Sequence, residues 1–282
     1  MVYFSAGGGT KYICEFVKKG LEQQGHTIDL IPIKKVHDPL LDFDEIPILG
    51  IASPVYDFNL SRIVRFWMMN IPRSNEPKKV FLIETCAGIP CASINVAQSI
   101  LLEKNYSLIG ALEVTTPTAE PWFNQKWNPW GWRTENLHRA FFYGMKLGFN
   151  LKRKIKGHLD FKMYMPGLNF LSYLMLRVDN QYNYGYIKLR KSRCIECYAC
   201  ERVCSVDAIK INRKKAIDGY SCMFCIACVR ICPTYALYIS YRPKATPPTK
   251  SESPKLIKGF IDPEKYKPPK RFKFTRNYFS YF

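Results

Sequence analysis

Apolar residues between positions 1 and 114 follow two patterns that alternate along the chain. Short apolar runs predict strands, and longer segments with apolar residues three or four positions apart predict helices. The predicted strands are 2–5, 27–31, 46–52, 80–83 and 108–114, and the predicted helices are 11–24, 60–70 and 93–104. Strands that alternate with helices in this way predict the α/β class, with a doubly wound, five-stranded parallel sheet. Helical spacing returns at 137–155.

Three segments follow the carboxyl ends of predicted strands, where an open parallel sheet binds its ligands. Segment 5–10 is a glycine-rich turn before a helix, so its N–H groups can converge on a phosphate. Segment 53–59 offers aromatic rings that can stack on a flat ligand, and segment 84–90 has small residues that let the backbone approach a ring edge. The candidate cofactor contacts are Ser5, Ala6, Gly7, Gly8, Gly9, Thr10, Pro54, Val55, Tyr56, Phe58, Asn59, Thr85, Cys86, Ala87 and Gly88.

Eight of the eleven cysteines form a C-x2-C-x2-C-x3-C pattern that occurs twice. Three thiolates at this spacing hold three corners of an iron–sulfur cube, and the fourth cysteine of each run ligates the other cluster. The pattern therefore predicts two [4Fe–4S] clusters. The predicted ligand sets are Cys194, Cys197, Cys200 and Cys232 for the first cluster, and Cys222, Cys225, Cys228 and Cys204 for the second. Two structural zinc sites are the alternative, but zinc needs only two pairs of ligands and does not require four cysteines within eleven residues, twice over.

The cysteine-rich segment resembles a bacterial-type two-cluster ferredoxin over residues 187–240, where we predict a small α+β domain. That family often has a proline after its fourth cysteine, as at Pro233, whereas the first run has Ser205 at this position. The departure removes no ligand.

Residues 1–118 resemble flavodoxin, and this resemblance implies an FMN cofactor. Ser5, Gly8 and Thr10 match the phosphate loop of that family, whereas Gly7 and Gly9 stand where flavodoxins have threonine and asparagine. The alternative is a flavodoxin-like fold that holds no flavin. Together, the two halves resemble the flavodoxin–ferredoxin fusions of anaerobes known as EFR1-family ferredoxins.

Two segments match neither half of this fusion. Residues 119–186 form an aromatic and basic connecting segment that contains Trp122, Trp127, Trp130 and Trp132, either as a wedge between domains or as a lid over the flavin. Residues 241–282 form a proline-rich tail with interleaved basic and aromatic side chains, which we interpret as an arm along a surface of this chain or of a partner. Such interleaving also suits single-stranded nucleic acid, but no nucleic-acid-binding fold accompanies it, so nucleic acid is not the expected partner.

The net charge of +19 favours an acidic partner surface, an anionic membrane or nucleic acid. We predict a larger redox enzyme or complex with an acidic docking surface, contacted in part by the tail. Reduced thiolates and the lack of a secretory signal or a bilayer-spanning apolar run predict a cytoplasmic protein.

These features predict an electron-transfer protein that carries low-potential electrons through two [4Fe–4S] clusters and FMN to a partner redox enzyme. The alternative is a dedicated iron–sulfur subunit of a larger redox complex, in which the flavodoxin-like half is a flavin-free docking module. A third hypothesis is a flavin enzyme that uses Cys86 and Cys91 on a small substrate, although the sequence contains no convincing catalytic constellation.

Overall fold

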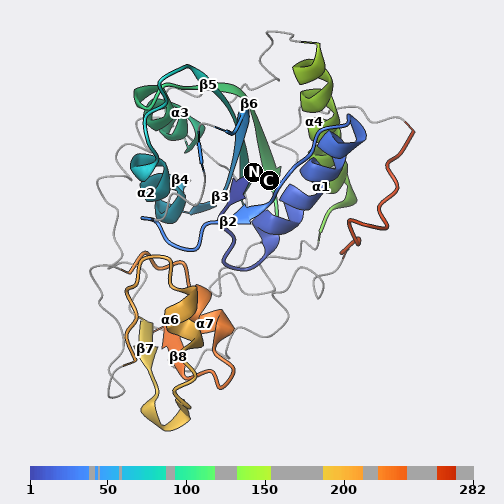
Figure 1. Cartoon of the computed structure of the whole chain (residues 1–282). Helices are drawn as coiled ribbons and strands as arrows, with labels where there is room; N and C mark the ends of the chain where they lie inside the picture. Colours follow the sequence, from blue (N-terminus) through green and yellow to red (C-terminus); the bar gives the residue numbers. More distant parts are fainter. Residues whose placement is uncertain are drawn as a thin grey trace, which may run out of the picture.

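The structure is a computed structural model that describes residues 1–37, 42–43, 45–56, 59–86, 93–117, 132–153, 187–211, 222–239 and 259–270. Figure 1 shows a layered α/β unit and, beside it, a smaller unit that contains the cysteine-rich segment. Within the described residues, no helix is long and apolar enough to cross a membrane.

The larger unit is built on a parallel sheet whose strand order is β2-β1-β3-β5-β6, and the short strand β4 pairs antiparallel with β3. This is the order of the flavodoxin-like doubly wound fold, so the predicted fold class is confirmed. The elements of this unit are β1 (Val2–Tyr3), α1 (Gly9–Gln23), β2 (Ile31–Pro32), β3 (Ile48–Tyr56), β4 (Asn59–Leu60), α2 (Arg62–Asn70), β5 (Lys78–Cys86), α3 (Ser93–Glu103), β6 (Tyr106–Thr115) and α4 (Thr134–Lys152). The smaller unit contains β7 (Ile187–Leu189), the 3-10 helix η2 (Lys191–Arg193), α6 (Ala199–Val203), α7 (Ala227–Ile231) and β8 (Leu237–Ile239).

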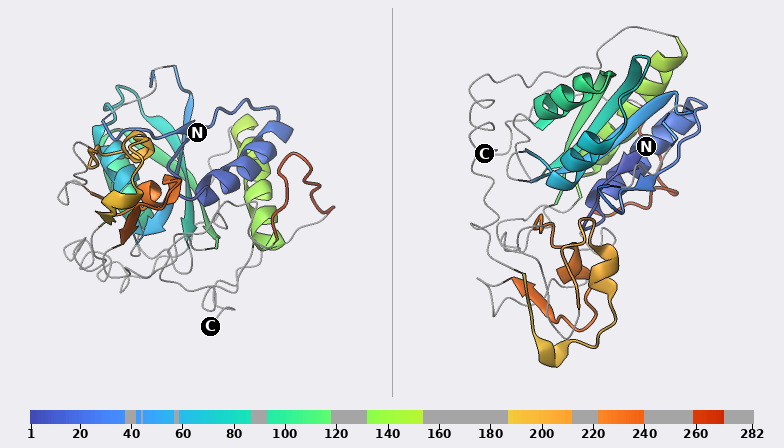
Figure 2. Two further views of the ribbon diagram at one scale, coloured as in Figure 1. Left: turned by 90° about the horizontal axis from the view of Figure 1, so that it is seen from below. Right: turned by 60° about the vertical axis from the view of Figure 1, so that its left-hand side comes forward.

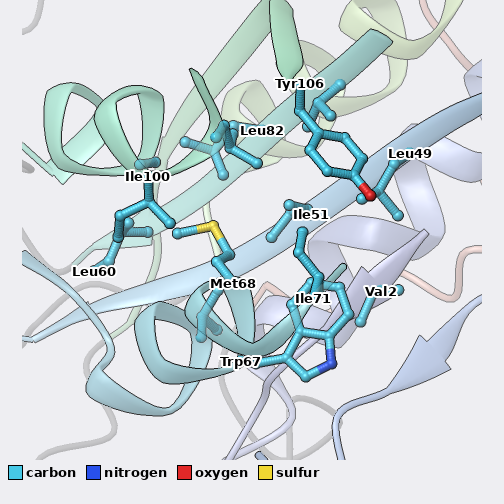
Figure 3. Packing of buried hydrophobic residues seen from close by; sticks show 14 of the residues in the cluster. Val2, Leu49, Ile51, Leu60, Trp67, Met68, Ile71, Leu82, Ile100 and Tyr106 are labelled. Atoms are coloured by element: carbon cyan, nitrogen blue, oxygen red, sulfur yellow. The ribbon is translucent and has the colours of Figure 1, made fainter. Parts of the chain in front are cut away.

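Helices cover both faces of the sheet, as the continuous apolar runs of its central strands require. Figure 2 shows α2 and α3 on one face and α1 and α4 on the other. Trp67 and Met68 of α2 pack over Leu49 and Ile51 of β3 and Leu82 of β5 (Figure 3). We call this buried cluster, which lies under α2 and α3, the first core.

The second core lies between the sheet and the pair α1 and α4. The two helices approach closely because each has a glycine at the contact. A Cβ atom on Gly144 would lie 2.2 Å from the carbonyl oxygen of Val17, and one on Gly20 would lie 2.1 Å from that of Phe141. The helix predicted at 137–155 is therefore part of the layer that covers the sheet, and the packing of this unit extends beyond residue 118.

Three of the differences from the predicted boundaries bear on the cofactor site or on the sheet edge. The strand predicted at 27–31 is shifted to Ile31–Pro32, where the N–H of Ile31 donates to the carbonyl of Met1. The segment 53–59 is not a loop at its start, because β3 continues to Tyr56 and forms a hairpin with β4 that satisfies the backbone groups of this region. Likewise, β5 continues to Cys86, so only the end of segment 84–90 follows the strand.

Residues 259–270, which we call the strap, lie along α1 and α4 (red in Figure 1). The ring of Phe260 stacks on that of Tyr12, with 5.0 Å between their centroids. The Tyr12 hydroxyl donates to the carbonyl of Ile261 at 2.7 Å and accepts from its N–H at 2.8 Å. Tyr266 packs edge-on against Phe16. Residues 259–270 of the predicted arm therefore lie on a surface of this chain. Contact between the tail and a partner stays a prediction.

Candidate metal centre and cofactor site

The two cysteine runs adopt the same local backbone conformation. A non-glycine residue with positive φ precedes each short helix: Tyr198, with φ 57°, before α6, and Ile226, with φ 56°, before α7. Other left-handed residues also occupy equivalent positions of the two runs, namely Glu196 and Phe224, and Asp207 and Tyr235. Non-glycine residues rarely adopt this conformation, and such residues concentrate at functional sites. The repeated pattern turns each cysteine run around a local centre.

Each run also provides a backbone donor to the sulfur of its fourth cysteine. The N–H of Ala208 lies 3.2 Å from Cys204 Sγ, and the N–H of Ala236 lies 3.2 Å from Cys232 Sγ. Burial alone would raise the pKa of Cys232, but N–H donors from Leu237 and Ala236, together with Thr234, lower its pKa overall. Hydrogen bonds to cluster sulfurs are one of the means by which a protein sets a reduction potential.

The first predicted ligand set surrounds one cavity. Its lining includes all four thiols of this set, Cys194, Cys197, Cys200 and Cys232. Leu189, Ile211 and Leu237 supply apolar walls. Burial raises the pKa of Cys200 to about 11, and the nearby thiols of Cys232 and Cys197 add to this effect. The last cysteine of the second run thus lines the same cavity as the first three of the other run, and the crosswise ligand sets stay a prediction.

The thiols of the second set also lie close together. Burial raises the pKa of Cys225 to about 12, and the thiols of Cys222 and Cys204 raise it further against an opposing backbone hydrogen bond from Ala227. Burial likewise raises the pKa of Cys228 well above its ordinary value. Metal binding requires deprotonated thiols, and the charge of bound iron would reverse this shift. Among the residues that the structure describes, no group of three or more His, Cys, Asp or Glu side chains is placed to hold a metal ion.

The predicted phosphate loop leads into the first turn of α1. Gly8 has φ 85° and, as the residue before the helix, has no side chain to cap the first N–H groups. The Ser5 hydroxyl accepts from the N–H of Lys11 at 3.2 Å, and the hydroxyls of Thr10 and Thr85 are hydrogen-bonded at 2.8 Å. Thr10 and Thr85, predicted from separate segments, therefore meet at one end of the sheet, and Ser5 contacts the same first turn of α1.

The hairpin β3–β4 carries the second group of predicted flavin contacts. Pro54 and Val55 lie within β3, and half-buried Tyr56 packs against the first core. Asn59 is buried; its Oδ1 accepts from the N–H of Leu60 at 2.9 Å, while its Nδ2 has no hydrogen-bond partner among the residues that the structure describes. A buried donor without a partner is costly, so this position suits a ligand acceptor. Phe58, Ala87, Gly88 and Cys91 lie outside the described residues.

Trp132 lies beside the phosphate loop. Its ring is 3.6 Å from the position that a Cβ atom of Gly9 would take, and its centroid is 4.5 Å from that of Tyr12. The strap is close too, because a Cβ atom on Gly259 would lie 2.1 Å from the Trp132 carbonyl oxygen. This tryptophan therefore packs the helix start against the strap. The other three tryptophans of the connecting segment, Trp122, Trp127 and Trp130, lie outside the described residues.

Two buried carboxyl groups were not predicted from the sequence. Glu84 and Glu113 are register partners on β5 and β6. Burial raises the pKa of Glu84 well above its ordinary value, against a hydrogen bond from the Ser93 hydroxyl. Burial raises the pKa of Glu113 to about 7, although Arg139 acts in the opposite direction. The available signal was a glutamate near the end of each of two neighbouring apolar strands.

The contact between the two units was also missed by sequence reasoning. Lys35 Nζ donates to the carbonyl of Cys204 at 2.8 Å and forms an ion pair with Asp207. The N–H of Val36 donates to the carbonyl of Ser205 at 3.0 Å. Since Lys35 and Val36 follow β2, this contact lies toward the carboxyl edge of the sheet. Ser205, where a proline was expected, is buried in it.

The comparisons with known proteins divide along the same two units. Residues 187–210 match the family model described as "4Fe-4S binding domain". No curated protein matches the chain. Among solved structures, a flavodoxin from the domain Archaea is 14% identical with a TM-score of 0.36, and the match covers 54% of this chain and 96% of that chain.

Two further solved structures match a similar share of the chain. Flavodoxin 2 from Bacillus cereus is 17% identical with a TM-score of 0.39, covering 54% of this chain and 97% of that one. The flavodiiron protein from Giardia intestinalis is 13% identical with a TM-score of 0.38, covering 54% of this chain and 35% of that one. The strand order and the family match together describe a flavodoxin-like unit followed by a 4Fe–4S binding segment, as predicted, and they support a role in electron transfer.

Proposed function

We propose that this chain is an electron-transfer protein that holds two [4Fe–4S] clusters and FMN and passes low-potential electrons to a partner redox enzyme. The observation that carries the proposal is the cavity lined by Cys194, Cys197, Cys200 and Cys232. These thiols come from both cysteine runs, and the crosswise arrangement is the one that two-cluster ferredoxins use. Membership in the EFR1-family fusions belongs to the same proposal.

The residues around the thiols fit such clusters. Cys204, Cys222, Cys225 and Cys228 would hold the second cluster, and the N–H groups of Ala208 and Ala236 would stabilise cluster charge through sulfur. Apolar side chains, among them Ile209, Ile211 and Leu237, are buried in the small core and would exclude water. When bound, the clusters supply one-electron chemistry, and FMN supplies one- or two-electron chemistry.

The flavodoxin-like unit fits FMN at its carboxyl edge. The start of α1, where Gly8 supplies no capping side chain, provides N–H donors and a positive dipole end for the phosphate. Ser5 and Thr10 border this position, and the Nδ2 of buried Asn59, which no described residue bonds, offers a donor to a ring oxygen. Tyr56, half-buried beside the same edge, supplies an aromatic surface for the ring.

Anaerobic reconstitution tests both cofactors at once. We expect about eight iron atoms and one FMN per chain. The variant Cys232→Ala should retain about half of the iron, whereas Cys14→Ala, which removes a buried thiol of α1 outside the predicted ligand sets, should retain all of it. Zinc in place of iron, or full iron in the Cys232 variant, would contradict the proposal.

The alternative function is a dedicated subunit whose flavodoxin-like unit is a flavin-free docking module. The aromatic ring of Trp132 beside Gly9 favours it, because that ring lies at the predicted phosphate loop. Eight iron atoms without flavin absorbance would support this alternative. A truncation after Lys270 then tests anchoring by the tail, since it preserves the strap contacts that deletion of the whole tail would destroy.

A further inference from the structure

The two cysteine runs have the same conformation but different surroundings. Met223 and Cys225 of the second run pack against the first core of the flavodoxin-like unit. In the first run, the residue equivalent to Met223 is Ile195, whose exposed fraction is 64%. Cys197, the equivalent of Cys225, is also exposed. One loop of the repeat is therefore covered by the chain itself, and its counterpart faces solvent.

The turns that follow the fourth cysteines differ in the same sense. The turn after Cys204 is held by Lys35 and by the N–H of Val36. In the turn after Cys232, Pro233 is exposed, and the preceding Ile231 has an exposed fraction of 48%. The second ligand set thus lies toward the flavodoxin-like unit, and the first set lies toward the outside.

Exposed apolar side chains gather around the first set. Six large hydrophobic residues are exposed in the described part of the chain, and three of them, Ile195, Tyr198 and Ile231, flank cysteines of this set. Lys191 and Arg193 of η2 and Arg202 of α6 are exposed nearby in sequence, against two exposed acids, Glu196 and Asp207, of which Asp207 already pairs with Lys35. An apolar centre with a mainly cationic rim is the arrangement of a docking surface for a protein of opposite charge.

We propose that this surface, which we call the outer face (Lys191, Arg193, Ile195, Tyr198, Arg202 and Ile231), docks the acidic surface of a redox protein. The inference rests on the proposed electron-carrier function and adds to it which ligand set faces the partner. Electrons pass between the flavodoxin-like unit and the second ligand set inside the chain, and between the first set and the partner across the outer face. Inside the chain, the loop of the second run that carries Met223 and Cys225 makes the equivalent contact with the flavodoxin-like unit.

Two haem proteins of opposite charge serve as probes: cytochrome b5, which is acidic, and cytochrome c, which is basic. Protein reduced with dithionite gives one electron to each oxidised haem iron, and the haem spectrum reports the rate. We expect faster reduction of cytochrome b5 at low salt and a decline of that rate as salt screens the attraction. Calorimetry with oxidised proteins measures binding without electron transfer.

Matched variants locate the surface. Arg193→Glu and Ile195→Asp should each lower the rate with cytochrome b5 and its affinity by about tenfold or more, as one reversed or introduced charge at an interface does. Lys79→Glu and Leu102→Asp make the same changes at exposed positions of the flavodoxin-like unit and should stay within about twofold of the wild type. With cytochrome c, Arg193→Glu should not reduce the rate.

The outcomes separate the two proposals. Iron content and cluster spectra are measured for each variant, and if Ile195→Asp loses iron, Arg193→Glu alone decides. Full iron content with unchanged binding and rates in the decisive variants would overturn the outer face and leave the electron-carrier function intact. Equal losses in the control variants would also overturn it. A wild-type chain without clusters would overturn the carrier function, while calorimetry would still test the surface.

Discussion

The flavodoxin-like unit and the cysteine-rich unit are stabilised in different ways. The first has strands of up to ten residues and helices of up to nineteen, with two cores that bury side chains on both faces of its sheet. The second has helices of five residues and strands of three. Such short elements bury little apolar surface for the chain entropy they must overcome. The larger unit should therefore fold without cofactor, whereas the smaller one should depend on its metal.

Removal of iron is expected to produce the largest difference in stability between the two units. Anaerobic chelation should abolish most hydrogen-exchange protection in peptides that cover residues 194–204 and 222–232, because cluster binding contributes folding free energy there. Peptides that cover β5 should keep their protection. Unchanged protection in the cysteine-rich unit after complete iron loss would show that its small apolar core is sufficient.

A substitution at the contact of α1 and α4 tests the other side of the comparison. Gly144→Ala should destabilise the flavodoxin-like unit by about 1–3 kcal/mol, because the added methyl meets the backbone of Val17 and the helices must separate. Its iron content should equal that of the wild type. Lys146→Ala, at an exposed position of the same helix, should change stability by less than about 0.5 kcal/mol. A stabilised Gly144 variant would mean that helix propensity outweighs the close approach.

The two units also differed in how much the sequence predicted. Apolar periodicity predicted the order and type of the elements in the larger unit, and cysteine spacing predicted two ligand sets, of which the first lines one cavity. The left-handed conformations at Tyr198 and Ile226 could not be predicted, because such a conformation in non-glycine residues is imposed by the surrounding fold. The hydrogen bond between Val36 and Ser205 could not be predicted either, since it joins backbone groups far apart in sequence.

The buried carboxyl of Glu113 predicts a pH effect confined to the larger unit. Its pKa is raised to about 7 from the ordinary value of 4.5, so the folded chain keeps this proton to higher pH than the unfolded chain. Between these pH values the unfolded state binds fewer protons, and stability falls as pH rises; above about 7 the loss is complete. Glu113→Gln should therefore gain stability relative to wild type, by up to about 3 kcal/mol at pH 8, and little at pH 4.

Thermal unfolding at several pH values measures this effect. Glu103→Gln, an exposed position at the end of α3, serves as the control and should show no comparable divergence from wild type between pH 4 and 8. If the Glu113 variant follows the wild type in parallel at every pH, Arg139 compensates the buried charge, and the carboxyl is ionised in the folded chain.

The strap gives the smallest expected effect, because it adds a local contact to a unit that already has two cores. Burial raises the pKa of Tyr12 to about 12, so its hydroxyl stays protonated and can donate to Ile261 at any ordinary pH. Tyr12→Phe removes this bond and the one from the Ile261 N–H but keeps the stacking on Phe260, so we expect a loss of about 1 kcal/mol and faster proteolysis within 259–270. Tyr106→Phe removes a hydroxyl that donates to Pro72 and should leave the proteolysis of the strap unchanged. Equal strap cleavage in the wild type and the Tyr12 variant would mean that aromatic packing by Phe260 and Tyr266 alone holds the strap on α1 and α4.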